Sequence, residues 1–360
     1  MTAARRWSLV AIGVVVLLLL PSGIAALPVR DAEISAAELL DRVRASADVP
    51  HSGYAESMGG LLLPVTDQFT SLVDLLGQRT RMRVWWRDAE DWRVDAVTAT
   101  GETGQYRDGN RNWTWEYEDG RATLGVEPVV RLPREADLLP SALGRRLLNE
   151  ATAEEVARLP AERIAGREAP GLRLTPGDVR STIARVDVWV HGESGLPLRV
   201  AVFGRGSDTA VLRTSYLDLT LAEPTGADTA FAPPTGAALR FDRVLYAASA
   251  ADRLAPVRPP PSLAGLDRRP RDTVGAVGEY GRGVTLLVAV PLRGRESEPL
   301  REEFEGAPGA ITDDLGTAVT VGPLSLLLTP HDHDRQTWLL AGTVTPDTLA
   351  EAAADLAVGP

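Results

Sequence analysis

One stretch, residues 81–120, constrains the fold more than any other part of this 360-residue chain. It holds five of the eight tryptophans in a protein that is only 5% aromatic. Apolar and polar residues alternate in two runs, 92–100 and 112–118, and a short aromatic run covers 82–87. Alternation with a period of two, in residues rich in aromatic and β-branched side chains, is typical of half-buried antiparallel strands. The stretch therefore predicts a meander of strands with a face rich in indole rings.

Turn-forming residues separate the predicted strands. They lie at Asp88 to Asp91, Gly101 to Gly104 and Asp108 to Asn110. Gly, Asn and Asp adopt the backbone conformations that tight turns need. The alternation in 112–118 places Trp113 and Trp115 on one face of a strand. From the residues alone two interpretations stay open: this face packs in the protein's own core, or it lines a cavity for a guest molecule.

Charge and cysteine content exclude several classes of function. The net charge is -11 and the pI is about 5.0, which argues against a nucleic-acid partner held by its phosphates. The chain has no cysteine, so disulfides, thiolate zinc sites, a cysteine nucleophile and a bacterial lipoprotein anchor are all excluded. Every basic residue is an arginine, which we attribute to GC-rich coding rather than to chemistry.

The N-terminus has the pattern of a targeting segment. Arg5 and Arg6 precede Trp7 to Leu27, which carries no charge. The pattern predicts that residues 1–27 are either a cleaved signal sequence or a retained transmembrane anchor, and both remain open. In either case we expect the rest of the chain on the extracytoplasmic side of the membrane, or secreted after cleavage.

The remaining chain predicts two α+β units. The larger covers 28–240, a connector with a proline-rich segment covers 241–272, and a smaller C-terminal domain covers 273–360. In the larger unit, Ser35 and Glu38 have the spacing of a capping box. It opens an amphipathic helix with Leu39, Leu40 and Val43 on one face. A second helix over 67–78 has a wide apolar stripe, so we expect it against a sheet or a cavity.

The C-terminal domain shows strand patterns at 283–291, 318–329 and 337–344, followed by a helix over 348–357. Its one cluster of histidine and aspartate, His331 to Asp334, follows a proline between two strands. Two histidines at this spacing could hold a metal with a carboxylate, but a solvated turn explains the segment better. Signatures of a serine nucleophile, a phosphate loop and a dinucleotide site are missing. We therefore predict no enzyme activity, no cofactor and no metal.

Three segments carry a resemblance to a known family. They are VWWRDAEDWRVDAVT, GQYRDGNRNWTWEYE, and ARVDVWVHGESGLPLRV followed by FAPP. In this order they resemble the LolA superfamily of lipoprotein carriers and lipid-binding lipoproteins, and the two-unit layout is similar to sigma-E regulators of the MucB/RseB type. The resemblance covers roughly residues 35–235, and the C-terminal part is similar in layout to the small domain of those regulators.

The resemblance implies an incomplete antiparallel β-barrel with plugging helices, plus a smaller C-terminal α+β domain. Its concave face would enclose an apolar cavity for an acyl chain, which gains about 0.8 kcal/mol for each buried methylene. We expect one side chain of each alternating pair to line it, together with the second helix. The candidate ligand-binding residues are Leu72, Leu76, Trp86, Trp92, Val94, Trp113, Trp115, Val186 and Val188.

Two functions follow from the resemblance. The first is an extracytoplasmic carrier or envelope sensor that binds an acyl lipid or a lipoprotein. The alternative is a non-catalytic regulatory protein with a filled interior, which binds an anti-sigma factor or another membrane protein. The second domain favours the regulator-like branch, because a simple carrier has no need of it.

Overall fold

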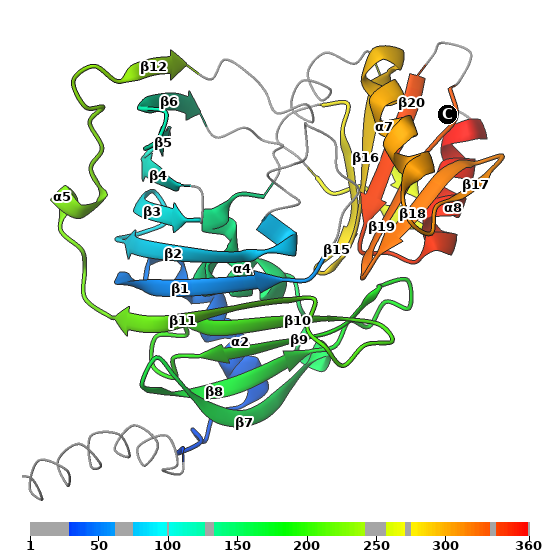
Figure 1. The fold of residues 1–360 in the computed structure, drawn as a ribbon. Coiled ribbons are helices and arrows are strands. Elements are labelled where there is room, and N and C mark those ends of the chain that lie inside the picture. Colours follow the sequence, from blue (N-terminus) through cyan, green and yellow to red (C-terminus); the bar gives the residue numbers. More distant parts are fainter. Residues whose placement is uncertain are drawn as a thin grey trace, which may run out of the picture.

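The structure, a computed structural model, describes most of the chain (Figure 1). The described residues are 29–61, 75–98, 101–126, 133–241, 257–270, 275–331 and 336–358. The predicted signal or anchor segment, residues 1–27, lies outside them, and so does most of the predicted helix over 67–78. Within these ranges no helix combines the length and the hydropathy needed to cross a membrane.

The larger unit is built on one sheet of 12 strands, in the order β12-β6-β5-β4-β3-β2-β1-β11-β10-β9-β8-β7 (Figure 1). Its strands are β1 (His51–Gly59), β2 (Arg79–Trp86), β3 (Asp91–Val97), β4 (Glu102–Asp108), β5 (Arg111–Glu116), β6 (Arg121–Val126), β7 (Val156–Ile164), β8 (Arg167–Leu174), β9 (Ile183–Val190), β10 (Pro197–Gly204), β11 (Leu212–Thr220) and β12 (Ala238–Phe241). Among them only β12 pairs parallel, with β6. The α+β class is confirmed, but the sheet is mixed rather than purely antiparallel.

The tryptophan-rich meander is confirmed as β2 to β5, with one correction. The predicted turn at Gly101 to Gly104 is wrong, because Glu102–Asp108 forms β4. Gly104 sits opposite Asp95 and Trp115 within the sheet. A Cβ atom there would lie 2.8 Å from the ring of Tyr106. This glycine therefore serves close packing in a strand rather than a turn.

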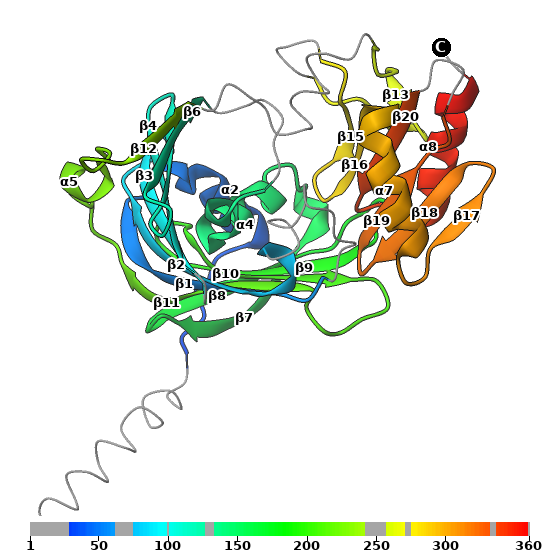
Figure 2. The same ribbon diagram turned by 45° about the horizontal axis from the view of Figure 1, so that its top comes forward.

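Two helices fill the hollow of the curved sheet, α2 (Ala36–Arg44) and α4 (Pro140–Leu148), as Figure 2 shows. Short 3₁₀ turns flank them: η1 (Ala45–Asp48), η2 (Glu135–Leu138) and η3 (Ala153–Glu155). The predicted cap of α2 is confirmed, because the Ser35 hydroxyl accepts from the Glu38 amide at 3.1 Å. The predicted apolar face is buried, with Leu39, Leu40 and Val43 packed against β7 to β10.

The Gly-Leu-Pro-Leu turn between β9 and β10 is shaped by its contact with α2. Gly195 has a left-handed φ of +70°. A Cβ atom there would lie 2.2 Å from the carbonyl oxygen of Arg42 in α2. The Arg42 guanidinium in turn donates to the carbonyl of Gly192 at 2.6 Å. Only glycine allows both the turn and the close approach of the helix.

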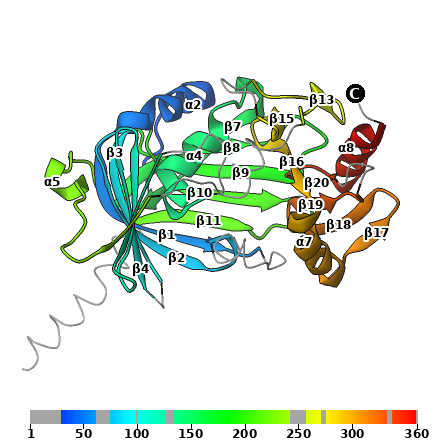
Figure 3. The ribbon, with the colours of Figure 1, turned by 90° about the horizontal axis from the view of Figure 1, so that it is seen from above.

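The C-terminal unit is a sheet of six antiparallel strands between two helices. Its order is β15-β16-β20-β19-β18-β17. Its elements are β15 (Gly278–Arg282), β16 (Thr285–Arg293), α7 (Gly294–Gly306), β17 (Ile311–Asp313), β18 (Gly316–Val321), β19 (Leu324–Leu328), β20 (Gln336–Gly342) and α8 (Pro346–Val358). Leu287 and Ala289 of β16 face α8, whereas Leu292 faces α7, so both faces of the sheet are covered (Figure 3). The strand predicted over 318–329 is two strands, and α7 had not been predicted.

Part of the predicted connector belongs to the C-terminal core. A hairpin of β13 (Ser262–Leu263) and β14 (Leu266–Asp267) follows the proline-rich segment. Leu263 and Leu266 are buried in the cluster that contains β16 and α8. The Tyr280 hydroxyl of β15 donates to the carbonyl of Pro260 at 3.0 Å. The exact domain boundaries remain a prediction.

A buried chain of polar groups ties α4 to the two central strands. His51 Nδ1 lies 2.9 Å from the carbonyl oxygen of Val49, which can only accept, so Nδ1 carries the proton. Nε2 therefore accepts from the Tyr216 hydroxyl at 2.8 Å, and the Ser141 hydroxyl donates to that oxygen at 2.9 Å. Burial lowers the pKa of His51 from 6.5 to about 4.

This network predicts a loss of stability in mild acid. Between pH 6.5 and pH 4 the unfolded chain binds a proton on His51 while the folded chain does not. The contribution of His51 to stability is thus complete above pH 6.5 and falls by about 3 kcal/mol as the pH drops to 4. Urea unfolding at pH 7 and pH 4.5 should show this slope, and His51→Gln should flatten it. His191, whose pKa burial also lowers, serves as the control: His191→Gln should keep most of the slope.

Candidate functional site

Three of the predicted ligand-binding residues share the concave face of the sheet. Trp86, Trp92 and Val94 are buried there beside Met82 and Val84 of β2. The indole rings of Trp86 and Trp92 stack at 5.6 Å with an interplanar angle of 1°. Leu76 packs partly buried against the same cluster, and Leu72 lies outside the described residues. The described part of this face is therefore a packed apolar layer.

Val186 and Val188 lie on the concave face too, but in a different cluster. Both are fully buried under Leu39 and Leu40 of α2. The helix thus covers the part of the sheet formed by β7 to β10. The prediction that these valines line the same space as Trp92 is not supported by the packing, because they belong to separate apolar clusters.

Trp113 and Trp115 lie on the opposite, outer face, so the predicted sharing of one face with Trp92 is wrong. Register decides this: Val94 pairs with Gln105, and Gln105 pairs with Thr114, not with a tryptophan. The intervening strand β4 was not recognised in the sequence, and without it the faces of β3 and β5 could not be related. The alternation within each strand was correct, but the relation between strands was not.

The outer face carries a cluster of aromatic rings that the sequence analysis did not assemble. Tyr106, Trp115 and Ala122 are buried there, with Trp113 and Phe231 packed against them. Phe231 comes from the segment after β11, which crosses outside β2 to β6. We call Tyr106, Trp113 and Trp115 the aromatic pocket.

An ion pair sits beside the aromatic pocket. Arg93 donates to both oxygens of Asp95 at 2.9 and 2.6 Å, and Asp95 is fully buried. The guanidinium also lies 4.6 Å from the ring of Trp85 and 5.2 Å from that of Tyr106. Planar stacking and a bidentate carboxylate suit arginine in this position. The charges of Arg93 and Asp95 thus neutralise each other, and the pair stiffens the outer face.

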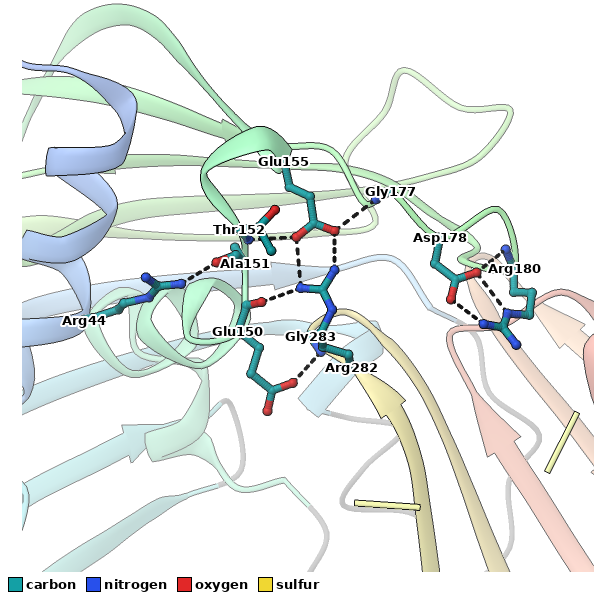
Figure 4. A network of polar contacts seen from close by, with 10 residues as sticks. All are labelled: Arg44, Glu150, Ala151, Thr152, Glu155, Gly177, Asp178, Arg180, Arg282 and Gly283. Carbon is teal, nitrogen blue, oxygen red and sulfur yellow. Dashed lines mark hydrogen bonds and ion pairs between the residues drawn. The ribbon is translucent and has the colours of Figure 1, made fainter. Parts of the chain in front are cut away.

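A second group of polar contacts, separate from Arg93 and Asp95, joins the larger domain to the C-terminal domain (Figure 4). Arg282, at the end of β15, donates to both oxygens of Glu155 in the larger domain, at 3.0 and 2.6 Å. Glu155 also accepts from the amides of Thr152 and Gly177. These bonds, the one from Arg282 above all, lower the pKa of Glu155 to about 2. The carboxylate therefore stays charged well into the acid range, and its bonds to Arg282 join the two domains.

Further contacts extend this junction in both directions. The amide of Gly283 donates to Glu150 at 2.7 Å, and Arg269 pairs with the same carboxylate. On the other side, the amide of Thr182 donates to the carbonyl of Thr343 at 3.0 Å. Arg180 donates to the carbonyl of Ala264 at 2.9 Å. Backbone bonds on one side and charged pairs on the other fix the orientation of the domains.

A small cavity lies within the junction. Its volume is about 50 Å³, and its lining residues are Leu147, Ala151, Glu155, Leu174, Pro176, Asp178, Arg282, Gly283, Val284 and Thr285. A space of this size holds water rather than an acyl chain.

His331 does not form a metal site with other described residues. Its Nε2 lies 3.0 Å from Glu298, and its Nδ1 lies 2.8 Å from the Thr337 hydroxyl. Among the described residues no three of His, Cys, Asp and Glu are grouped as metal ligands. His333 and Asp334 lie outside these residues.

Comparisons with known proteins were made with the sequence and with the fold. No protein family and no curated protein matches the sequence. A solved complex of MucA and MucB from Pseudomonas aeruginosa is similar with a TM-score of 0.50 and 16% identity, over 88% of this chain and 96% of that one. MucB solved alone has a TM-score of 0.43 at 16% identity, over 89% and 96% of the two chains. A LolA superfamily protein from Nitrosomonas europaea has a TM-score of 0.25 at 15% identity, over 55% and 98%.

The curved sheet with helices in its hollow, joined to a small second sheet, defines a two-domain α+β protein. MucB is a solved protein with a similar fold, and the match covers 88% of this chain. The resemblance seen in the sequence is thereby confirmed at the level of the fold.

The junction predicts a measurable effect of one charge. Arg282→Gln leaves Glu155 without its cation and should lower the free energy of unfolding by about 1–2 kcal/mol. It should also loosen domain docking, which small-angle X-ray scattering detects as a larger radius of gyration. Arg213→Gln, an exposed arginine of β11 outside the junction, is the matched control. Equal stability and equal radius for both variants would contradict a clamp at Arg282.

Proposed function

We propose that this chain is a non-catalytic regulatory protein that binds the extracytoplasmic part of a membrane protein of the anti-sigma factor type. The observation that carries the proposal is the two-domain fold shared with MucB, which has been solved as a complex with MucA. The match covers 88% of this chain and 96% of the other. A regulator needs a fixed arrangement of binding surfaces, and the junction contacts supply one.

The polar groups of the described residues favour binding over catalysis. Arg282 with Glu155 and Arg93 with Asp95 are bidentate charged pairs, and in both the partners satisfy one another. The lowered pKa of Glu155 makes it a poor general base near neutral pH. Such groups position surfaces and orient domains.

We place the protein on the extracytoplasmic side of the membrane. Arg5 and Arg6 before an uncharged apolar segment favour this orientation, whether or not the segment is removed. The MucB-like fold supports the same location. A partner would then present a segment outside the cytoplasm, where both chains can meet.

The partner can be identified by cross-linking in the native host. Because the chain has no lysine and no cysteine, common amine- and thiol-reactive reagents do not modify its side chains. A photoreactive amino acid should be placed singly at exposed apolar positions on different surfaces, at Leu217, Leu239 and Ile311. We expect a membrane protein with an extracytoplasmic segment to be captured from one of these positions, and the purified segment to bind the purified chain. Capture of no membrane protein from any position would contradict the proposal.

Binding of an acyl lipid on the concave face is the second candidate function. Leu76, Trp86, Trp92 and Val94 form an apolar layer there, and Leu72 would add to it from the neighbouring segment. Val186 and Val188 would take part only if α2 moved away from them. Trp113 and Trp115 are not candidates for that cavity because they lie on the outer face.

Native mass spectrometry separates the two candidates. A chain that begins at Val29 keeps every described element. Under the regulatory proposal we expect the mass of the protein alone, and Trp92→Ala should cost about 3–5 kcal/mol of stability, as in a packed core. A retained lipid mass, together with a small stability loss in Trp92→Ala and a weaker lipid signal, would favour lipid binding. Trp85→Ala, which removes a half-buried ring from the outer face beside Arg93, is a control for general effects of losing an indole.

A further inference from the structure

A strap of chain, residues 222–241, crosses the outer face of β2 to β6 (Figures 1 and 2). It begins after β11, includes the single turn α5 (Gly226–Thr229), and ends in β12. The strap lies on the side of the sheet opposite α2 and α4. Its helix α5 packs against β2 and β3, where Thr229 is buried, and three further attachments hold the rest of it.

The first attachment is an exposed ion pair. Glu223 accepts from Arg87 at 2.9 Å, and 62% of its side chain is exposed. Arg87 has a second carboxylate, Asp91, at 2.5 Å. Arg87 therefore keeps a partner if Glu223 leaves, and an exposed pair of this kind adds little stability.

The second attachment is the side chain of Phe231. Its ring lies 4.5 Å from that of Tyr106, 5.4 Å from Trp113 and 6.0 Å from Trp115, measured between ring centroids. The partly buried ring of Phe231 thus packs against all three rings of the aromatic pocket. Offset and tilted rings at these distances attract one another beyond simple burial.

The third attachment is strand β12. It pairs parallel with β6 through four residues, from Ala238 opposite Arg121 to Phe241 opposite Leu124. All four side chains of β12 are exposed, with 56% of Leu239 and 68% of Phe241 accessible. Backbone hydrogen bonds, rather than side-chain packing, therefore hold this strand on the sheet.

We propose that the strap occupies a docking groove for an extended segment of the protein partner, and that the partner displaces it. This inference rests on the function proposed above. The segment would insert an aromatic side chain between Tyr106, Trp113 and Trp115. It would then add a strand to β6, as Phe231 and β12 do within the chain. Strand addition to a sheet edge is a common way to bind extended peptides.

The sheet keeps its structure when the strap leaves. β6 stays paired with β5 from Arg111 to Glu116, and the large apolar clusters on the concave face contain no strap residue. Within the strap the buried residues are Pro224 and Thr229. Release then exposes the edge of β6 and the aromatic pocket together, which gives the partner both an anchor site and a backbone template.

A reversible lock tests this inference. Because the chain has no cysteine, Thr123→Cys with Arg240→Cys can form one intramolecular disulfide between paired residues of β6 and β12. Thr312→Cys with Thr317→Cys, whose hydroxyls lie 3.2 Å apart in the C-terminal sheet, is the matched control. The loosening variant is Phe231→Ala, which empties the aromatic pocket.

The probe is a labelled synthetic peptide of the strap itself, AEPTGADTAFAPPTGAALRF. It should bind the chain carrying Phe231→Ala at least about tenfold more tightly than the unmodified chain, because the resident strap no longer competes. It should not bind the oxidised lock, and reduction should restore binding. The same peptide carrying Phe231→Ala should fail to bind, which reports use of the aromatic pocket.

The second experiment measures binding of the captured partner segment to the locked chain. Oxidation of the β6–β12 lock should weaken its binding at least about tenfold, and oxidation of the control pair should not. If the peptide fails to bind the Phe231→Ala chain, the proposed docking groove is contradicted, whatever partner is found. If the partner segment binds equally well to the oxidised and the reduced lock, the partner does not use the groove. The proposed regulatory function is then unaffected. If the strap peptide binds as expected but no membrane protein is captured in the host, the groove is supported and the proposed regulatory function is contradicted.

Discussion

The antiparallel pairing of β1 with β11 holds the larger domain together. These strands are more than 150 residues apart in the chain, yet residues 52–59 pair with 212–220 and join the two halves of the sheet. His51 and Tyr216 hydrogen-bond across this pair, and Ser141 attaches α4 to it. Without the pairing, the meander of β2 to β6 and the strands β7 to β11 would be separate sheets. The hollow that holds α2 and α4 would not exist.

The two faces of the resulting sheet have different roles. On the concave face, α2 and α4 cover apolar side chains, and the described part is filled. On the outer face, the aromatic pocket is covered by a strap that the chain supplies from its own sequence. The proposed displacement of this strap would let a partner bind on the outer surface, while the concave face stays packed. The tryptophans relevant to that proposal are Trp113 and Trp115 on the outer face, not Trp86 and Trp92 in the hollow.

The junction between the domains adds a further constraint. Glu155 and Glu150 belong to the larger domain, and Arg282, Gly283 and Arg269 belong to the smaller one. The low pKa of Glu155 keeps its carboxylate charged well below neutral pH. Because the domains are held in one orientation, surfaces on both can be presented to the same partner. A fold with independent domains would lose that advantage.

Local patterns in the sequence determined much of the larger domain. Alternation predicted the strands of the meander, the spacing of Ser35 and Glu38 predicted the start of α2, and the order of segments predicted a fold of the MucB type. These features depend on neighbouring residues, whose geometry has a fixed period. Only the tertiary structure decided which face each strand presents, because one unrecognised strand, β4, reverses the relation between Trp92 and Trp115. It also decided that Phe231 covers Trp113, since contacts between distant segments depend on register and packing, which no local pattern encodes.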